Sequence, residues 1–372
     1  DMSPQNRHIE KLAANYPDGQ QQIRNLMGGK YYWYSDGKDQ FNSIILHEDD
    51  RAATAVHTPI GLLQHKRLLF GEKNSPVIAQ QLYREAIQTL PTEMQDRISN
   101  FQDDLAERCD TDEQCAKHFV RFLQMCREEG ITLVPKKTCV FAESVTFYGF
   151  KISETGTEYQ DKNVDPIRRL RVPESLRDLR RTLGLFVQLK DYVPKYRIRA
   201  RPLSSMTSEK HWEKGKNPMG EAQIRAFHDL KTEMTRGVHL HTHDQKKPLC
   251  LGFDASREGA GAYLYQLSDD IDDKGEKKHL VIAYWSLPFN STEQRLPAYY
   301  REGLAFVKSV QWSKLYTDYS SFPLRVITDH KPLVALQWVK HTSGRGKLSD
   351  FLFQILEIIC FDHTQIKLKI RM

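Results

Sequence analysis

The chain lacks three features that would assign it to common classes of protein. It has no run of eighteen apolar residues, so the sequence predicts no membrane-spanning helix and no membrane partner. It has no internal repeat and no low-complexity tract, which excludes a solenoid of stacked repeats. Its six cysteines include no Cys-x-x-Cys pair, which argues against a zinc site and indicates reduced thiols in a cytosolic or nuclear setting.

What the chain does contain is typical of a globular protein with more than one domain. Its 372 residues are 40% hydrophobic and 27% charged, which allows a sizeable core, and this length favours two or three domains. The first residues, Asp1-Met2-Ser3-Pro4, form neither a signal peptide nor a natural start. We therefore expect the sequence to be a piece of a longer polypeptide.

Positive charge is concentrated in one segment. The net charge is +6, but residues 162–201 hold twelve Lys or Arg against four acidic residues. Such a block is often a solvated helix face, yet clustered arginines also bind phosphate backbones through bidentate contacts and counterion release. We favour nucleic-acid binding, with five candidate residues: Arg168, Arg169, Arg177, Arg180 and Arg181.

Three carboxylates suggest chemistry on nucleotides. Phe101-Gln102-Asp103-Asp104 carries two of them, and Asp36 stands alone upstream. An isolated Asp-Asp pair usually lies on a solvated turn, but carboxylates split in this way can hold two divalent cations at one point, as in-line phosphoryl transfer requires. Because side chains alternate along a strand, we expect Asp104 to point away from Asp103 and to have a secondary role.

The first part of the chain mixes helix and strand patterns. Residues 20–29, 75–90 and 113–129 are expected to be helices, and residues 31–35, 44–46, 131–134 and 146–152 to be strands, with 31–35 delivering Asp36. Helices joined to an antiparallel hairpin predict an α+β domain over residues 1–153. Residues 154–245 form the next segment, which begins with a linker over 154–163 and continues with helices at 176–189 and 221–235.

The last part, residues 246–372, predicts a mixed α/β domain. Strands are expected at 249–254, 260–267, 280–285, 324–328 and 364–370, and helices at 292–316 and 347–358. Just before it, His239, His241 and His243 alternate along a short segment. They could ligate a metal, but no fourth ligand is nearby, so we favour a surface strand.

Several sequence blocks resemble, in order, the reverse transcriptase and ribonuclease H region of the Pol polyprotein of gypsy-type long-terminal-repeat retrotransposons, and the resemblance covers nearly the whole chain. In the first domain these are Asp36 to Phe41, Ile45 to Asp50, Phe70 to Pro76 with Gln80, Phe101 to Asp104, Leu133 to Lys137 and Phe147 to Ser153. Further on they are Pro173 to Leu185, Phe253 to Ser256, Arg301-Glu302 and Thr328 to Leu333.

The resemblance implies a fold in three parts. An α+β reverse-transcriptase palm, an antiparallel sheet with helices and partial fingers, would occupy residues 1–153. A helical thumb and connection would occupy 154–245, followed by a C-terminally truncated RNase H-like mixed α/β domain over 246–372. The implied partners are a primed template or RNA/DNA hybrid, deoxynucleoside triphosphates and the rest of a Pol polyprotein, in a cytoplasmic retroelement particle or in the nucleus.

For the first domain, the resemblance implies a polymerase site. Asp36 and Asp103 would ligate two Mg²⁺ ions, with Mn²⁺ as an alternative, and Asp104 would assist. Residues of the nucleotide pocket would be Phe41, under the incoming sugar, with Phe70, Gln80 and Lys136. Phe41 could instead be a core aromatic and Gln80 a helix-surface amide. The primer grip would comprise Phe147, Tyr148 and Gly149.

For the last domain, the resemblance implies a second two-metal site that hydrolyses RNA. Asp254, Glu302 and Asp329 would converge on two cations, although each alone could be an ordinary surface acid. The family's basic fingers residues and fourth ribonuclease H acid are not matched. We therefore expect weak polymerase and little hydrolase activity from these 372 residues.

Departures from the family pattern leave an alternative open. Gly37, Glu72, Ser75 and Gln102 replace residue types usual at those positions, and Gly37 is expected to loosen a strand that should be stiff. The alternative is a domesticated or degenerate scaffold of the same fold, which binds nucleic acid without catalysis. The full set of acidic residues argues against it, because clustered carboxylates repel one another without a metal.

Overall fold

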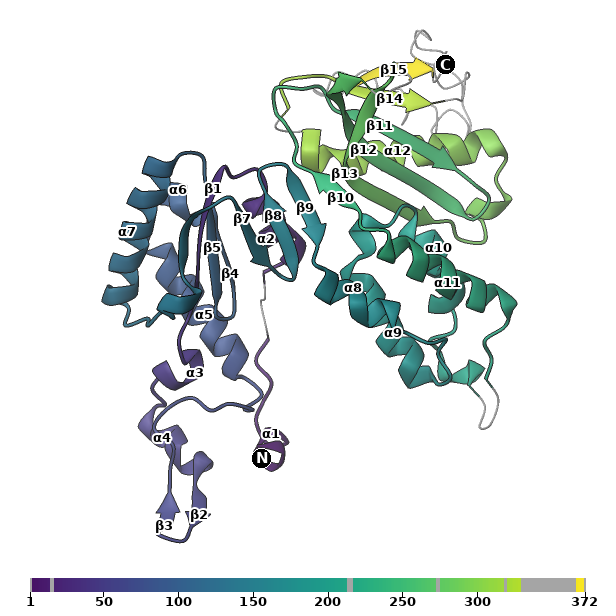
Figure 1. Ribbon diagram of the computed structural model, residues 1–372. Coiled ribbons are helices and arrows are strands. Elements are labelled where there is room, and N and C mark those ends of the chain that lie inside the picture. The colour runs from purple at the N-terminus through teal and green to yellow at the C-terminus, as the bar shows by residue number, and fades with distance from the viewer. Residues whose placement is uncertain are drawn as a thin grey trace, which may run out of the picture. The chain divides into compact units, whose positions relative to one another are not determined.

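The computed structural model describes residues 2–13, 17–212, 217–271, 275–317, 320–328 and 366–370 (Figure 1). The chain divides into two compact units, Asp1–Thr157 and Glu158–Met372. The predicted linker 154–163 is wrong in part, because it contains β9 (Gly156–Tyr159) and the start of α8 (Asp161–Arg168). Thr157 of β9 is buried, which explains how a segment rich in polar residues forms a strand.

The first unit is built on a four-stranded antiparallel sheet in the order β4-β5-β1-β6. The strands are β1 (Tyr31–Asp36), β4 (Ile98–Phe101), β5 (Asp104–Cys109) and β6 (Cys139–Ala142). Aromatic residues dominate β1, as strand propensity favours, and Tyr32 and Trp33 are fully buried. The predicted strand 31–35 is confirmed, and it does deliver Asp36 at its end.

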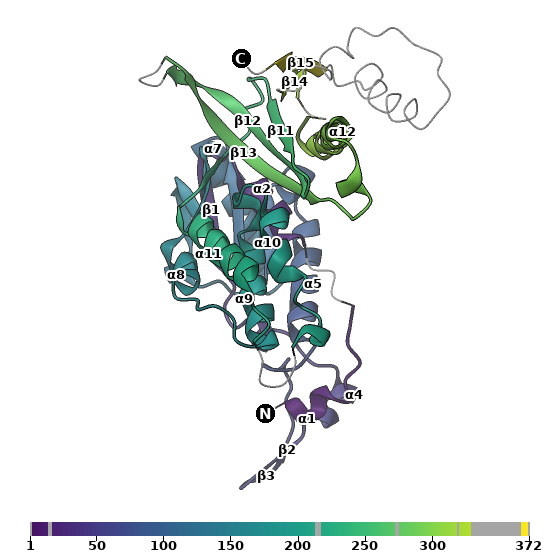
Figure 2. The same ribbon diagram turned by 90° about the vertical axis from the view of Figure 1, so that its right-hand side faces the viewer.

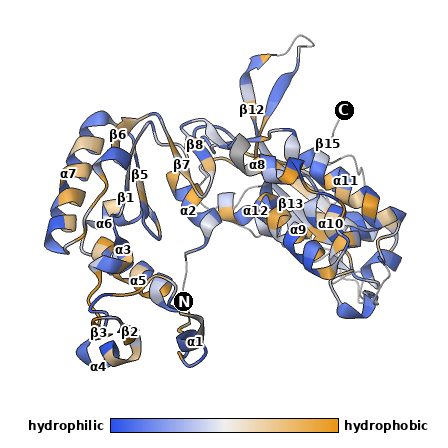
Figure 3. Cartoon of the chain, turned by 60° about the horizontal axis from the view of Figure 1, so that its bottom comes forward, coloured by the Kyte–Doolittle hydropathy of each residue, from blue (hydrophilic) through white to orange (hydrophobic). Residues whose placement is uncertain are grey.

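Helices cover the sheet of the first unit. α5 (Ser75–Gln88) and α7 (Asp112–Glu128) share one core with Trp33 and Leu105, and α2 (Gly19–Leu26) contacts β4 and β5. The Thr111 side chain caps α7 by accepting a hydrogen bond from the Gln114 N–H, and Gly130 follows the helix at φ 70°. In Figure 3, α7 carries both hydrophobic and hydrophilic residues, as its partly buried position requires.

Two predicted strands of this unit are wrong. Segments 44–46 and 131–134 contribute only isolated bridges, Ile45 to Arg67 and Leu133 to Gly37. The predicted strand 146–152 is instead a hairpin of β7 (Ser144–Phe147) and β8 (Phe150–Ser153), because Tyr148 and Gly149 both adopt positive φ and reverse the chain. The remaining short elements are α1 (Ser3–Asn6), α3 (Gln40–Ser43), α4 (Glu48–Arg51), α6 (Thr92–Gln95), β2 (Val56–Thr58) and β3 (Gly61–Leu63).

The second unit begins with helices. After α8 come α9 (Leu176–Gln188), α10 (Tyr196–Ser204) and α11 (Glu221–Thr235), and Phe186 of α9 lies 6.1 Å, between ring centroids, from Phe227 of α11. The short strand β10 (His239–His241) buries Leu240 and leaves the two histidine rings in contact at 4.5 Å.

A five-stranded sheet completes the second unit, in the order β13-β12-β11-β14-β15. Its strands are β11 (Cys250–Ala255), β12 (Gly259–Ile271), β13 (Lys277–Pro288), β14 (Leu324–Thr328) and β15 (Ile366–Ile370). β14 runs parallel to both neighbours, and the other pairs are antiparallel. The helix α12 (Ala298–Thr317) packs on this sheet (Figure 2). It starts later than predicted, directly after Pro297, and the predicted helix 347–358 lies outside the described residues.

Two sequence expectations concern general properties. Within the described ranges, no helix has the length and apolar character needed to cross a bilayer. Among the described residues there is no disulfide bond at Cys109, Cys115, Cys126, Cys139 or Cys250. Reduced thiols stay a prediction, and Cys360 lies outside the described residues.

Candidate active site

Three carboxylates meet at one end of the first unit's sheet. Asp36 ends β1 and pairs with Asp104 across the antiparallel ladder, while the N–H of Gly37 donates to the Asp103 carbonyl over 2.7 Å. Residues directly opposite each other in such a ladder point to the same face. Asp104 therefore lies on the face of Asp36, and Asp103 occupies the adjoining turn, so all three acids are neighbours.

A lysine from a separate segment joins this acidic end. Lys137, in a 3-10 turn at Pro135–Lys137, hydrogen-bonds through Nζ to Asp36 Oδ2. The hydrogen bond to Asp36 is the main cause that raises the pKa of Lys137, and Asp103 and Asp104 raise this pKa further. The predicted nucleotide-binding residue was Lys136, which is exposed. Because Lys136 and Lys137 are adjacent and of the same type, the sequence does not indicate which of them contacts Asp36.

A buried tyrosine approaches two of the carboxylates from α5. Burial is the main cause that raises the pKa of Tyr83, and the charges of Asp103 and Asp36 raise it further. The Tyr83 hydroxyl also fills the space beside Gly37, since a Cβ at residue 37 would lie 2.2 Å from it. Glycine at position 37 therefore makes room for Tyr83. This steric role takes the place of the expectation that Gly37 loosens the strand.

Replacing Gly37 with alanine is expected to destabilise the first unit by about 1–3 kcal/mol, because the buried Tyr83 ring must move. The Tyr83→Phe change removes the clashing oxygen and should recover part of the loss. Urea unfolding of both single variants and the double variant measures the coupling. If the changes in unfolding free energy of the two single variants simply add in the double variant, the contact is contradicted.

Side-chain amides hold the turn that carries Asp103. Gln102 adopts a left-handed φ of 53°; its N–H donates to Gln80 Oε1 over 2.7 Å, and its carbonyl accepts from Gln40 Nε2 at 2.9 Å. Asn100 Nδ2 also donates to this carbonyl, and Gln80 Nε2 donates to Asn100 Oδ1. Gln80 is only 5% exposed, so the interpretation as a helix-surface amide is wrong. Its observed contacts fix the acidic turn.

The two aromatics predicted to line the nucleotide pocket do lie together. Phe41 in α3 and Phe70 make an edge-to-face contact with ring centroids 4.9 Å apart. Phe70 is 62% exposed and Phe41 is half-buried, so Phe41 is not the fully buried core aromatic of the alternative interpretation. Both rings are accessible to a ligand.

The predicted primer-grip hairpin contacts the acidic turn. Tyr148, at the tip between β7 and β8, packs on Phe101 with centroids 4.3 Å apart. Burial is the main cause that raises the pKa of Tyr148 to about 12, with Asp18 adding to the effect. Phe147, the last residue of β7, is buried. Gly149 supplies the second positive φ that the two-residue turn needs.

The five arginines predicted to bind nucleic acid are all exposed on or beside α8 and α9 of the second unit. Arg168 forms an ion pair with Asp165 at 2.9 Å, and Arg180 donates to the Thr207 carbonyl at 3.2 Å. Both contacts are local and involve exposed arginines, so we expect each to be weak.

The described structure includes two of the three acidic residues predicted for the second unit. Phe253 packs towards α12, with its ring 5.9 Å from that of Phe306. Asp254 follows it on β11 and so points to the opposite face, where Lys195 Nζ lies 2.6 Å from its Oδ2. Glu302 is on α12 itself. Asp329 lies outside the described residues.

The two acidic ends differ in how well they suit a divalent cation. Carboxylate oxygens are the ligands that Mg²⁺ prefers, and Asp36, Asp103 and Asp104 are neighbours at the end of the β1–β5 ladder. Asp254 offers one carboxylate, paired with Lys195 as Asp36 is paired with Lys137. Among the described residues no three His, Cys, Asp or Glu side chains are arranged to hold a metal, so an ion at Asp36 would need ligands from a substrate as well. His239 and His241 likewise belong to no such group of ligands among the described residues.

Comparison with known proteins agrees with this arrangement. Residues 2–152 match the family described as reverse transcriptase (RNA-dependent DNA polymerase), and residues 219–324 match the RNase H-like domain found in reverse transcriptase. The Tf2-3 and Tf2-7 transposon polyproteins of Schizosaccharomyces pombe are each 23% identical to the chain over 337 residues. The alignments cover 90% of this chain but 24% of each relative, so the chain spans only a small part of their length.

Solved structures show the same fold. A foamy viral protease–reverse transcriptase dRH in complex with double-stranded DNA matches 98% of this chain and 61% of its own, with a TM-score of 0.73 and 21% identity. The foamy viral protease–reverse transcriptase in complex with RNA/DNA hybrid matches 100% of this chain and 48% of its own, with a TM-score of 0.65 and 20% identity. The predicted fold class is confirmed.

Proposed function

Because this chain carries a reverse transcriptase domain and an RNase H-like domain, as in retrotransposon polyproteins, we propose that it synthesises DNA on a primed RNA or DNA template. The observation that carries this proposal is the meeting of Asp36, Asp103 and Asp104 at one end of the β1–β5 ladder. Their natural context would be a Pol polyprotein in a cytoplasmic particle or in the nucleus.

Each part of the site has a role in this reaction. Asp36 and Asp103 would hold two divalent cations, Mg²⁺ in the first instance, which activate the primer 3′-hydroxyl and neutralise the triphosphate. Lys137 hydrogen-bonds to Asp36 and would orient it until the substrates arrive. Phe41 would lie beneath the incoming sugar, where a ring leaves no room for a 2′-hydroxyl. The Tyr148 hairpin would position the primer end, and the arginines of α8 and α9 would bind the duplex backbone.

Hydrolysis of the RNA strand is not part of this proposal. Asp254 lies on the sheet face opposite α12, which carries Glu302, and Asp329 lies outside the described residues. We infer that the second unit contributes nucleic-acid binding.

Primer extension tests the proposal directly. With a labelled primer on an RNA or DNA template, deoxynucleotides and Mg²⁺, we expect the primer to lengthen. Chelation of the metal with EDTA should stop the reaction, and resupply of Mg²⁺ or Mn²⁺ should restore it, because carboxylates alone cannot neutralise a triphosphate. Gel electrophoresis of the products measures both effects. Extension that continues in excess EDTA, or no extension under any metal, would contradict the proposal.

A second candidate function is a non-catalytic scaffold that binds nucleic acid. One observation favours it: Asp36, at the end of β1, and Asp254, within β11, are both paired with lysines of the same chain. In a scaffold these ion pairs would be permanent and would take the place of metal ions. Duplex binding without any primer extension would identify this function.

A further inference from the structure

Lys195 has an unusual position for a lysine. It directly precedes α10 and adopts a left-handed φ of 55°, a conformation that residues other than Gly, Asn and Asp seldom take. Its Nζ lies 2.6 Å from Asp254 Oδ2. Its stem crosses Gly261, where an added Cβ would lie 2.6 Å from the lysine Cγ.

The sheet is shaped to receive this lysine. Asp254 pairs with Gly261 across the β11–β12 ladder, so the two residues share a face. Gly259 lies on the same face, and an added Cβ there would come within 2.9 Å of Ile198 in α10. Ala260 and Ala262, which alternate with these glycines, point to the core on the other face. Two missing side chains thus allow the start of α10 to lie close to β12.

We propose that Lys195 is the built-in counter-ion of Asp254. Its ammonium group occupies the place beside this carboxylate that a divalent cation would need, and the contact fastens α10 to the sheet. The consequence is that the RNase H-like unit excludes metal from Asp254, whereas Asp36, although paired with Lys137, has Asp103 and Asp104 beside it. The inference concerns the second unit alone and does not depend on the polymerase proposal.

Electrostatics and geometry both support this assignment. The lysine and the carboxylate belong to one folded unit, so the pair forms without loss of translational freedom. A hydrated cation would have to shed water, displace the ammonium group and bind through one carboxylate. The pair is partly exposed, with side chains 42% and 63% accessible, so its strength is modest. We therefore expect that removing it opens the site only severalfold.

Iron-directed cleavage of the full chain tests metal binding near Asp36 and Asp103 separately from metal binding near Asp254. Fe²⁺ bound to a protein in the presence of ascorbate and peroxide cuts the backbone close to its ligands. In the unaltered protein we expect fragments from cuts near residues 36 and 103 and little cleavage near 254. Failure of cleavage at residues 36 and 103 would count against the polymerase proposal and leave the Lys195 inference intact.

Two variants disrupt the contact from opposite sides. Lys195→Asn removes the amine and keeps a residue that tolerates a left-handed φ, and Gly261→Ala displaces the lysine stem by its new methyl group. Both should raise cleavage near residue 254 about threefold to fivefold, the range set by a partly exposed ion pair, without change at residues 36 and 103. Circular dichroism establishes that each variant is folded.

Matched controls complete the test. Lys195→Arg keeps the charge, and Lys190→Asn removes a nearby lysine; both should leave the cleavage pattern unaltered. Equal cleavage near residue 254 in the unaltered protein and the two disrupting variants would overturn the inference. So would the absence of cleavage there in every protein, because Lys195 would then not be what keeps the cation away.

Discussion

The Asp36→Asn variant is expected to lose primer extension by roughly 1,000-fold or more, about 4 kcal/mol of transition-state stabilisation. Asp36 is 8% exposed and fixed at the end of a central strand, so an amide can replace it with little change in shape. What disappears is the negative charge that would hold the cations at the 3′-hydroxyl and the triphosphate. Single-turnover extension of a labelled primer measures the loss.

A neighbouring aspartate provides the matched control. Asp39 is exposed, has a left-handed φ of 51° that asparagine tolerates, and makes no side-chain cap to α3. Asp39→Asn should therefore extend primers at nearly the unaltered rate. Fluorescence anisotropy should show unchanged duplex binding for both variants, because the arginines of α8 and α9 are untouched. If Asp36→Asn kept more than a tenth of the activity, the catalytic role of Asp36 would be refuted.

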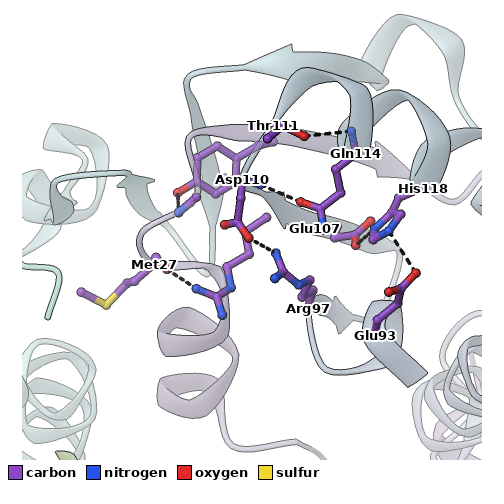
Figure 4. A network of polar contacts seen from close by, with 11 residues as sticks. Met27, Glu93, Arg97, Glu107, Asp110, Thr111, Gln114 and His118 are labelled. Atoms are coloured by element: carbon purple, nitrogen blue, oxygen red, sulfur yellow. Dashed lines mark hydrogen bonds and ion pairs between the residues drawn. The ribbon is translucent and has the colours of Figure 1, made fainter. Parts of the chain in front are cut away.

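The Glu107→Ala variant is expected to destabilise the first unit by about 3–5 kcal/mol, the largest effect on stability that we predict. Glu107 is fully buried in β5. It accepts hydrogen bonds from Trp33 Nε1 at 2.5 Å and shares a 2.6 Å contact with His118 Nδ1 (Figure 4). His118 Nε2 faces Glu93 at 3.7 Å. Truncation to alanine leaves a cavity and removes the hydrogen-bond partner of the buried Trp33 Nε1 and His118 Nδ1. Urea unfolding followed by tryptophan fluorescence measures the change.

Glu107→Gln is the informative control, because it keeps an acceptor for Trp33 and removes the charge. Burial is the main cause that raises the pKa of Glu107, against the opposing influence of His118 and Trp33. A raised pKa in the folded state means that the folded state holds the proton more tightly. Glu107 should therefore contribute most at pH values below its ordinary pKa, and this contribution should fall as the pH rises through the raised value. Glu107→Gln should lack this dependence. The opposite slope would contradict the assigned direction.

Elements with strong local signals could be predicted from the sequence. Helix α11 (Glu221–Thr235) and strand β14 (Leu324–Thr328) have the predicted bounds. Apolar residues recur with helical periodicity in α11 and at alternate positions in β14, and each pattern predicts its element. Segments 44–46 and 131–134 have apolar composition typical of strands, but each finds a partner at one position only. Pairing depends on neighbours distant in the chain, which composition does not reveal.

The predicted acidic residues at the end of β1 are neighbours in the structure, but their surroundings could not be predicted. Lys137 contacts Asp36 where its neighbour Lys136 was expected to act, and the sequence gives both the same residue type. Gln80 supports the turn through its buried amide. This role depends on the left-handed φ of Gln102, which no sequence pattern predicts. Glu107 and His118 come from a strand and a helix, and their contact depends on how these two elements pack.

The central place of β1 in its sheet has a consequence for how the protein is made. This strand pairs with β5 on one side and with β6 on the other, and both lie far downstream in the chain. A ribosome therefore releases an aromatic-rich segment, Tyr31-Tyr32-Trp33-Tyr34, long before either partner emerges. Both of its edges stay open for that interval, and open apolar edges invite association between growing chains. Shielding by a chaperone during synthesis should matter more for this segment than for β14, whose partner β11 has already been made.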